Sequence, residues 1–313
     1  MCGNNMRYDV SAFGADPTGK ADSTAAFQAA ITETWNYGGD ICGSGVFLVG
    51  NLAVLNPNYH RPRAYISGQI VLAPGAVWNG AINLFGSSTW GINTQNFLAG
   101  LNQVRLTPSV TSPFAITLPS HSELDSVYID PVGPGFTSIG ILGASLIKMK
   151  SVSINLTAAG SAGIIVDGSF WLGMEDISIC SDGAATNILQ FLTEATSATF
   201  TGIVRARNII LYGGSVLIKS ASKDCKDMVF EDLQCEVLPA NCALFNLDDT
   251  GNPGGIYGLS LIRPRMIDPV GFSSVFSTVN QSPAGSQIRV TDPQGFKSTI
   301  AAGSAGFNDL IVS

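Results

Sequence analysis

The sequence predicts an all-β solenoid, a stack of short parallel strands with one helix at its N-terminal end. Three observations lead to this prediction: a repeat of about 25 residues, strand-like alternation inside each repeat, and a turn-rich composition. The 313 residues include 35 glycines and 15 prolines, and only 12% are charged. A period of 20–50 residues is typical of solenoids, whose units bury their apolar face only by stacking on their neighbours.

The repeat appears when five segments are aligned, namely 122–130, 147–155, 172–180, 204–212 and 228–236. Their first apolar column contains Leu124, Met149, Met174, Ala206 and Phe230, with steps of 25, 25, 32 and 24 residues. A second strand repeats in phase, beginning at Ile139, Ile164, Leu189, Val216 and Phe245. The alternation has the period of a strand. We therefore expect successive rungs to be hydrogen-bonded at about 4.8 Å.

A polar column accompanies the apolar ones. Its charges alternate in sign along the repeat: Asp125, Lys150, Glu175, Arg207 and Glu231. In-register stacking would place these side chains next to one another on the outer surface. The column is open to two interpretations, a strip that binds a ligand or a ladder of solvated ion pairs.

The N-terminal segment predicts a capping helix. Asp22 or Ser23 can begin it, and Gly38-Gly39 ends it. Over 23–35 the apolar residues fall on one face, at Phe27, Ala30, Ile31 and Trp35. A single amphipathic helix can close the end of a solenoid and protect the exposed strand edge from further pairing.

The same segment carries a resemblance. Residues 10–31 read VSAFGADPTGKADSTAAFQAAI, which resembles the N-terminal signature of the pectate-lyase-like right-handed β-helix superfamily, including its bacteriophage tailspike branch. The resemblance implies a right-handed parallel β-helix with an N-terminal capping α-helix. It also implies assembly as a homotrimer and an activity in binding or cleaving polysaccharides.

We expect one domain over residues 1–313. It would comprise a strand and capping helix (1–39), irregular first rungs (40–122), regular rungs (123–268) and a C-terminal cap or subunit contact (269–313). Residues 64–104 contain no charged side chain, which suits buried rungs or a surface that faces another subunit. Pro74 and six glycines interrupt that stretch, so it does not predict a membrane-spanning helix.

Composition argues against nucleic-acid binding and against a metal or cofactor site. The net charge of −7 and pI near 4.7 argue against nucleic-acid binding, which needs a clustered basic surface. No apolar signal region is visible at the N-terminus, and we expect the six cysteines to be reduced. With two histidines and no paired cysteine spacing, we expect no metal site and no cofactor.

Neither histidine lies in a sequence context typical of a nucleophilic triad. The remaining candidate chemistry is glycoside hydrolysis by a pair of carboxylates. Retaining hydrolysis needs two carboxylates about 5–5.5 Å apart, and inverting hydrolysis needs them about 6.5–9.5 Å apart. Residues one rung or two rungs apart in a column, at about 4.8 Å per rung, have similar spacings. The second strand places Asp248 in an outward column with Lys219, beside Asp249 and the acidic segment 224–236. We predict Asp248 or Asp249, paired with a neighbour such as Glu231, as the catalytic carboxylates. The alternative is that Asp248 forms an ion pair with Lys219 across one rung.

Local resemblances add candidates. Residues 246–249 (NLDD) resemble fragments of the N-x-D and D-D signatures of polygalacturonase-type β-helices, without the G-H-G and R-x-K partners. Arg263-Pro264-Arg265 resembles the arginine-and-proline stretch of calcium-dependent pectate lyases, although a solvated turn would explain it too. Trp171, next to Glu175, is the candidate sugar platform. Trp78 and Trp90 are interpreted as core or subunit contacts. The predicted substrate-binding residues are Trp171, Glu175, Lys219 and Arg263.

The leading hypothesis is a tailspike-like protein of a virion, made in the host cytoplasm, that binds a host surface polysaccharide, with cleavage left open. If it cleaves, we expect hydrolase rather than lyase chemistry. The alternatives are a non-enzymatic structural or decoration protein that contacts other virion proteins, and a free-standing polysaccharide lyase.

Overall fold

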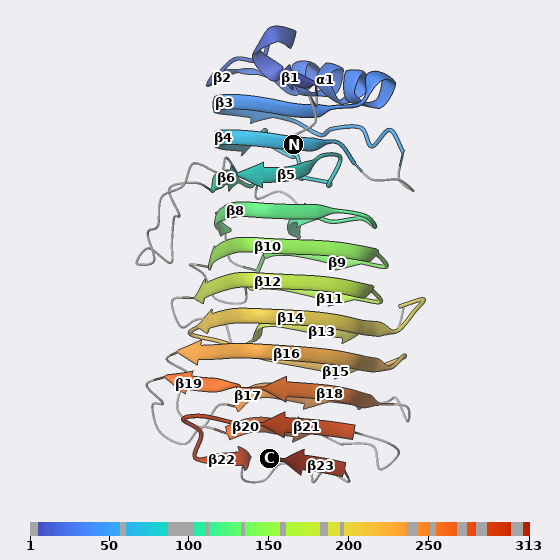
Figure 1. The fold of residues 1–313 in the computed structure, drawn as a ribbon, viewed down its shortest axis with the longest axis vertical. Helices are drawn as coiled ribbons and strands as arrows, with labels where there is room; N and C mark the ends of the chain where they lie inside the picture. The colour runs from blue at the N-terminus through green and yellow to red at the C-terminus, as the bar shows by residue number, and fades with distance from the viewer. Residues whose placement is uncertain are drawn as a thin grey trace.

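The computed structural model describes residues 6–56, 61–86, 103–109, 113–132, 135–156, 161–181, 187–194, 197–236, 243–250, 255–267, 274–279, 287–301 and 309–313. Their strands stack in two parallel sheets along one axis, with a helix across the N-terminal end (Figure 1). The predicted fold is confirmed: the chain forms a right-handed parallel β-helix with an N-terminal α-helix. Right-handed crossovers are the rule for parallel strands, because strand twist and connection then agree.

The larger sheet contains fifteen strands. They are β1 (Arg7–Asp9), β2 (Thr18–Asp22), β3 (Asp40–Val49), β4 (Arg63–Leu72), β5 (Asn83–Gly86), β6 (Val104–Thr107), β8 (Glu123–Val132), β10 (Ser145–Leu156), β12 (Phe170–Ser181), β14 (Thr201–Tyr212), β16 (Cys225–Glu236), β18 (Ile256–Ile262), β19 (Arg265–Ile267), β21 (Gln287–Thr291) and β23 (Asp309–Val312).

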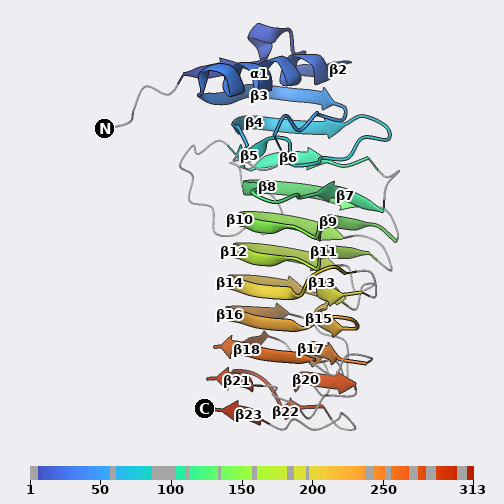
Figure 2. The same ribbon diagram turned by 90° about the vertical axis from the view of Figure 1, so that its right-hand side faces the viewer.

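The smaller sheet contains eight strands and lies beside the larger one (Figure 2). They are β7 (Phe114–Thr117), β9 (Thr137–Leu142), β11 (Ala162–Asp167), β13 (Asn187–Thr193), β15 (Ser215–Ser220), β17 (Ala243–Asp248), β20 (Ser274–Val279) and β22 (Ser298–Ile300).

The register predicted from the repeat is the observed one. Met149 pairs with Leu124 and Met174, and Ala206 pairs with Met174 and Phe230. All five side chains are buried, so the apolar columns form the core between the sheets. Aromatic rings continue from rung to rung, with centroids 5.3–6.0 Å apart along Phe191, Phe230, Phe245 and Phe276.

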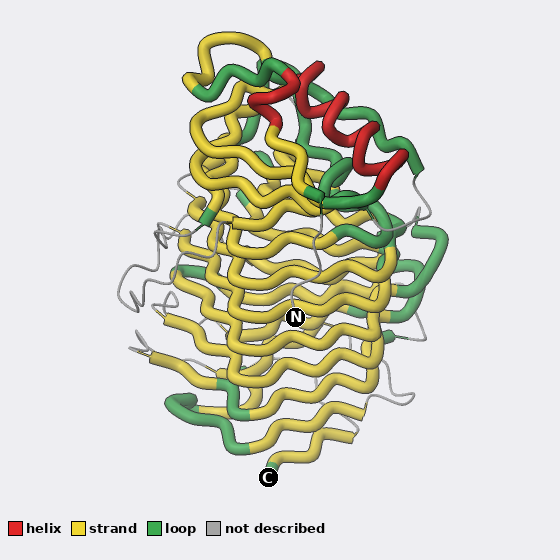
Figure 3. Tube along the Cα trace, turned by 45° about the horizontal axis from the view of Figure 1, so that its top comes forward, coloured by secondary structure: helices red, strands yellow, loops and turns green. Residues whose placement is uncertain are grey.

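The helix α1 (Thr24–Tyr37) lies across the end of the stack (Figure 3). Its buried Phe27 meets Phe47 of β3 edge to face, with ring centroids 5.4 Å apart. Asp22 accepts hydrogen bonds from the backbone and hydroxyl of Thr24 at the helix start. Ser23 instead accepts from the backbone of Asp16, so its side chain joins the preceding loop to the helix. The helix ends at Gly38, where φ is 74°.

The long strands bend at two rows of residues with positive φ. The first row contains His121, Leu146, Trp171, Ile203 and Asp227, and the second contains Ser126, Ser151, Asp176, Asn208 and Asp232. A non-glycine residue in this conformation costs about 1–2 kcal/mol. The hydrogen-bonded ladder on either side imposes it, and four residues of each rung run straight between the rows.

The described part of the uncharged stretch contributes alternate side chains to the core. In β4, Ile66 and Ile70 are fully buried, and Trp78 is 2% exposed. Trp90 lies outside the described residues. Within the described ranges, no helix is long and apolar enough to cross a membrane.

Candidate functional site

A groove runs along the outer face of the larger sheet, over the first row of bends and the segment between the two rows. It crosses β8, β10, β12, β14 and β16, and it consists of two adjoining hollows of about 450 and 520 Å³. Both hollows are lined by Glu123, Lys148, Gly173 and Arg205. The four spacings between its five rungs, at about 4.8 Å each, make the groove about 19 Å long.

Each rung presents two outward positions to the groove. From β8 to β16 the pairs are Glu123 and Asp125, Lys148 and Lys150, Gly173 and Glu175, Arg205 and Arg207, and Val229 and Glu231. Acidic rungs therefore alternate with basic rungs. We call the first members the inner column and the second members the outer column.

The outer column is in part a ladder of ion pairs. Lys150 Nζ lies 3.5 Å from Glu175 Oε2, and both side chains are about half exposed. Glu231 Oε1 accepts a hydrogen bond from Arg263 Nη2 at 2.9 Å. Exposed pairs of this kind contribute little to stability, about 0–1 kcal/mol each. This column thus fits the salt-ladder interpretation at these positions.

Arg263 also binds the neighbouring Asp232 with two hydrogen bonds of 2.7 and 2.8 Å. These bonds lower the pKa of Asp232 below its ordinary value, and together with Glu231 they raise the pKa of Arg263. Arg263 itself continues the second row of bends, with φ of 50°. It lies beside the end of the groove and is engaged by two carboxylates.

Three cations of the groove have no ion pair among the described residues. Lys148, Arg205 and Arg207 are all exposed. Arg205 Nη1 donates to the backbone carbonyls of Val204 and Asp227, at 3.0 and 3.1 Å. Arg207 lies between Glu175 and Glu231 in the ladder, but the ion pairs of those two carboxylates go to Lys150 and Arg263.

An aromatic side chain borders the groove at its middle rung. Trp171 is 50% exposed and lines the same hollow as Gly173. Its ring lies 5.2 Å from that of Phe170, which stacks on Phe200 at 5.3 Å. Because Trp171 belongs to the first row of bends, its large side chain stays at the surface, outside the packed core.

The predicted site residues fall into two groups. Trp171, Glu175 and Glu231 line the groove, and Arg263 contacts Glu231. Lys219 and Asp248 belong to β15 and β17 of the smaller sheet, and Asp249 follows β17. Glu231 and Asp248 therefore lie on different sheets, and catalysis by that pair stays a prediction.

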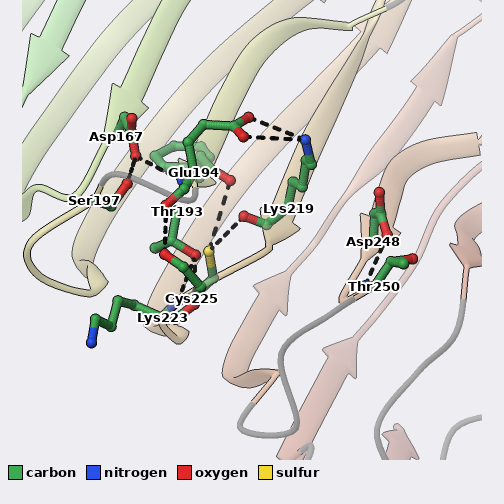
Figure 4. Close-up of polar contacts among 11 residues, drawn as sticks. Asp167, Thr193, Glu194, Ser197, Lys219, Lys223, Cys225, Asp248 and Thr250 are labelled. Carbon is green, nitrogen blue, oxygen red and sulfur yellow. Dashed lines mark hydrogen bonds and ion pairs between the residues drawn. The ribbon is translucent and has the colours of Figure 1, made fainter.

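On the smaller sheet, the predicted column of outward residues is observed, but its side chains contact loops. Lys219 is the backbone neighbour of Asp248, yet its Nζ pairs with Glu194 at 3.1 Å (Figure 4). Asp167 accepts from the backbone of Glu194 and from the hydroxyl of Ser197. These contacts hold Glu194 and Ser197 against the smaller sheet.

Asp248 has a local partner, the backbone amide of Thr250, at 3.0 Å (Figure 4). Asp249 is 5% exposed. Nearby, burial raises the pKa of the Cys225 thiol, whose Sγ donates to the carbonyl of Lys219. Cys225 is therefore a protonated packing residue, in line with the expectation of reduced cysteines.

Sequence reasoning missed Lys148, Gly173 and Arg205. They lie two residues before the members of the alternating column, on the same face of each strand. Because side chains on a strand point to alternate faces, the signal was present in the aligned repeat. The aligned repeat does not show where the strands bend, and the bends determine which outward residues line the groove.

The arrangement suits recognition better than acid catalysis. Glu175 and Glu231 share the outer column two rungs apart, about 9.6 Å between backbones. Inverting glycosidases hold their carboxyl groups about 6.5–9.5 Å apart. However, each of these carboxylates lies next to a cation, whereas a general acid needs surroundings that disfavour its charged form. No cluster of three or more metal-binding side chains occurs among the described residues.

Comparisons with known proteins give similarity to solved structures at low sequence identity. No protein-family model matches the sequence, and no curated protein matches it. Similar solved structures include the A-module of the mannuronan C-5 epimerase AlgE6 of Azotobacter vinelandii (15% identity, 98% of each chain covered, TM-score 0.44). An exopolygalacturonase from Thermotoga maritima is 11% identical, with 97% of this chain and 93% of that one covered and a TM-score of 0.41. The Dettilon tailspike protein is 11% identical, with 98% and 68% covered and a TM-score of 0.35.

Proposed function

We propose that this protein is a tailspike-like binding protein that holds a host cell-surface polysaccharide in the groove of its larger sheet. The observation that carries the proposal is the half-exposed Trp171 beside an open position at Gly173, flanked by cations that form no ion pair with any residue the structure describes. Sugar rings stack on exposed aromatic faces, and charged side chains at the rim provide orientation.

The N-terminal resemblance at residues 10–31 supports a virion as the setting, with a homotrimer as the assembled form. On a virion, the β-helix would present the groove to the host surface, and contacts with other virion proteins would involve other parts of the chain. Native mass spectrometry tests the assembly: three copies are expected, and a monomer at micromolar concentration would contradict the trimer.

The binding test uses the purified chain on an array of bacterial capsular polysaccharides and O-antigens. Trp171→Ala should weaken binding about 10-fold, because aromatic contacts of this kind contribute about 0.5–1.5 kcal/mol beyond area burial. Tyr212→Ala is the matched control, since Tyr212 is an exposed aromatic at the end of β14 and does not line the groove. Equal loss in both variants, or no binding by the parent protein, would contradict the proposal.

Cleavage is a second candidate, favoured by the two-rung spacing of Glu175 and Glu231 in the groove. Release of oligosaccharides that is lost in Glu231→Gln would assign hydrolysis to the groove. Loss in Asp248→Asn or Asp249→Asn would instead assign it to the smaller sheet, as the sequence predicts. Products that carry a new double bond would indicate lyase chemistry.

The non-enzymatic alternative has its own outcome in the same experiment. A structural or decoration protein would neither retain nor shorten any polysaccharide on the array. Binding without release would leave the protein an adhesin.

A further inference from the structure

The inner column of the groove has a gap in its pattern of charges. In the outer column, every rung from β8 to β16 carries a charge, and the sign alternates. In the inner column, the acidic Glu123 is followed by Lys148, Gly173, Arg205 and the apolar Val229. Alternation would place a carboxylate at both Gly173 and Val229, and of these two positions Gly173 is the one that lies between two cations.

Packing does not explain the glycine. A Cβ built on Gly173 would have its nearest atoms 4.0 Å away, and its φ lies outside the left-handed region. Gly202, on the next rung, is different, because a Cβ there would lie 2.0 Å from the carbonyl oxygen of Lys226. A glycine inside a strand weakens the strand and often marks a place where a ligand or another backbone approaches closely. At Gly173 the nearest described backbone atom is the carbonyl oxygen of Ile147, 4.0 Å from the added Cβ.

The two flanking cations are exposed and without an ion pair in the described part of the chain. Lys148 and Arg205 are the in-register neighbours of Gly173, one rung to either side. Their backbones are therefore about 9.6 Å apart, with the open position midway. Arg205 already uses Nη1 on two backbone carbonyls, which leaves the rest of its guanidinium to a ligand. A planar guanidinium and a compact ammonium suit carboxylate, sulfate and phosphate oxygens.

Building on the proposed function, we propose that the groove selects an acidic saccharide, whose anionic group lies over Gly173 between Lys148 and Arg205 while its ring packs against Trp171. The ligand then supplies the negative charge that the inner column lacks. The shared chemistry is an anionic oxygen group, either a carboxylate of a uronic or sialic acid or a sulfate or phosphate ester.

The test fills the gap with a side chain. Gly173→Asp places a carboxylate between the cations, and Gly173→Asn places a neutral group of nearly the same size there. Both fit, because the surrounding space is open and the backbone conformation is ordinary. If the carboxylate of Gly173→Asp takes the place of the ligand's anionic group, this variant should weaken binding of acidic glycans at least about 10-fold more than Gly173→Asn does. Ser178→Asp, on the same strand but outside the groove, controls for the added charge.

The ligands are the capsular and O-antigen polysaccharides of the array, each acidic member paired with its carboxyl-reduced, desulfated or dephosphorylated form. The expected result is at least about 10-fold tighter binding of acidic forms, reduced by salt. The derivative that loses binding identifies the anionic group. Equal binding of acidic and neutral forms, with loss in Trp171→Ala, would leave the proposed function and overturn this inference. Equal losses of acidic-glycan binding in Gly173→Asp and Gly173→Asn would also overturn this inference. Absence of binding by the parent protein would contradict the proposed function itself.

Discussion

Asp16 shows how a single residue in the N-terminal segment organises the end of the stack. Its carboxylate accepts hydrogen bonds from the backbone amides of Thr18, Lys20 and Ala21, and from the Thr18 hydroxyl. These bonds hold the pKa of Asp16 at about 2, below the ordinary 3.8. The loop that joins the first turn to the helix is therefore built around one ionised carboxylate.

A pH dependence follows from this pKa. Because the folded-state pKa lies below the unfolded one, Asp16 stabilises the fold above about pH 4, and this contribution is lost as the pH falls through about 2. Asp16→Asn should lower stability at pH 7 and have a smaller effect near pH 2. Urea unfolding at both pH values measures this difference. Asp40→Asn, outside the loop, is the control, and a pH-independent cost of the Asp16 variant would contradict the account.

At the scale of one rung, the bends decide what the surface can do. Each of β10, β12, β14 and β16 has 12 residues, with straight segments on either side of its bends. The central segment contributes two outward side chains to the groove. Glycines in these strands have different surroundings, since Gly202 is required by close approach of the next rung, whereas Gly173 faces open space.

This contrast predicts opposite responses to the same substitution. Gly202→Ala should be strongly destabilising, because its Cβ would overlap the carbonyl of Lys226 and force adjacent rungs apart. Gly173→Ala should be neutral or slightly stabilising, since alanine loses less conformational entropy on folding, by about 0.5–1 kcal/mol. Chemical denaturation of the two variants tests this, and similar costs would contradict the assignment of Gly173 as open space.

At the scale of the whole molecule, the stack depends on how its N-terminal end is closed. The described chain stacks rung on rung from β3 to β23, and α1 lies over the first of these rungs (Figure 1). Phe27 is fully buried against Phe47 at this end, whereas Phe230 is fully buried within the stack.

Replacing either phenylalanine by alanine should cost about 3–5 kcal/mol through loss of buried surface and the cavity left behind. Only Phe27→Ala should also loosen the helix and expose a strand edge that can pair with another chain. Light scattering at sub-denaturing temperature should therefore show self-association for Phe27→Ala and not for Phe230→Ala. Equal association of the two variants would show that α1 does not protect this end.

The periodic apolar residues of the sequence by themselves determined the solenoid, the helix at its start and the register of its columns. A rung whose apolar residues repeat at the same positions can bury them in one stacking register only. The sequence also supplied Trp171, Glu175 and Glu231 as surface residues, because their strand positions point outward.

Only the tertiary structure decided where the groove lies and which charges remain unpaired. The first row of bends includes Leu146, Trp171 and Ile203, whose residue types do not indicate positive φ. The second row includes Asp and Asn, which adopt it more readily, so residue type reveals only part of the bends. The partner of Lys219 was equally hidden: the loop after β13 brings Glu194 within 3.1 Å, so the lysine pairs there and not with Asp248. The positive-φ bends and the loop contacts form only when the rungs are stacked. The bends define where the groove lies, and the loop contacts pair the charges of the smaller sheet.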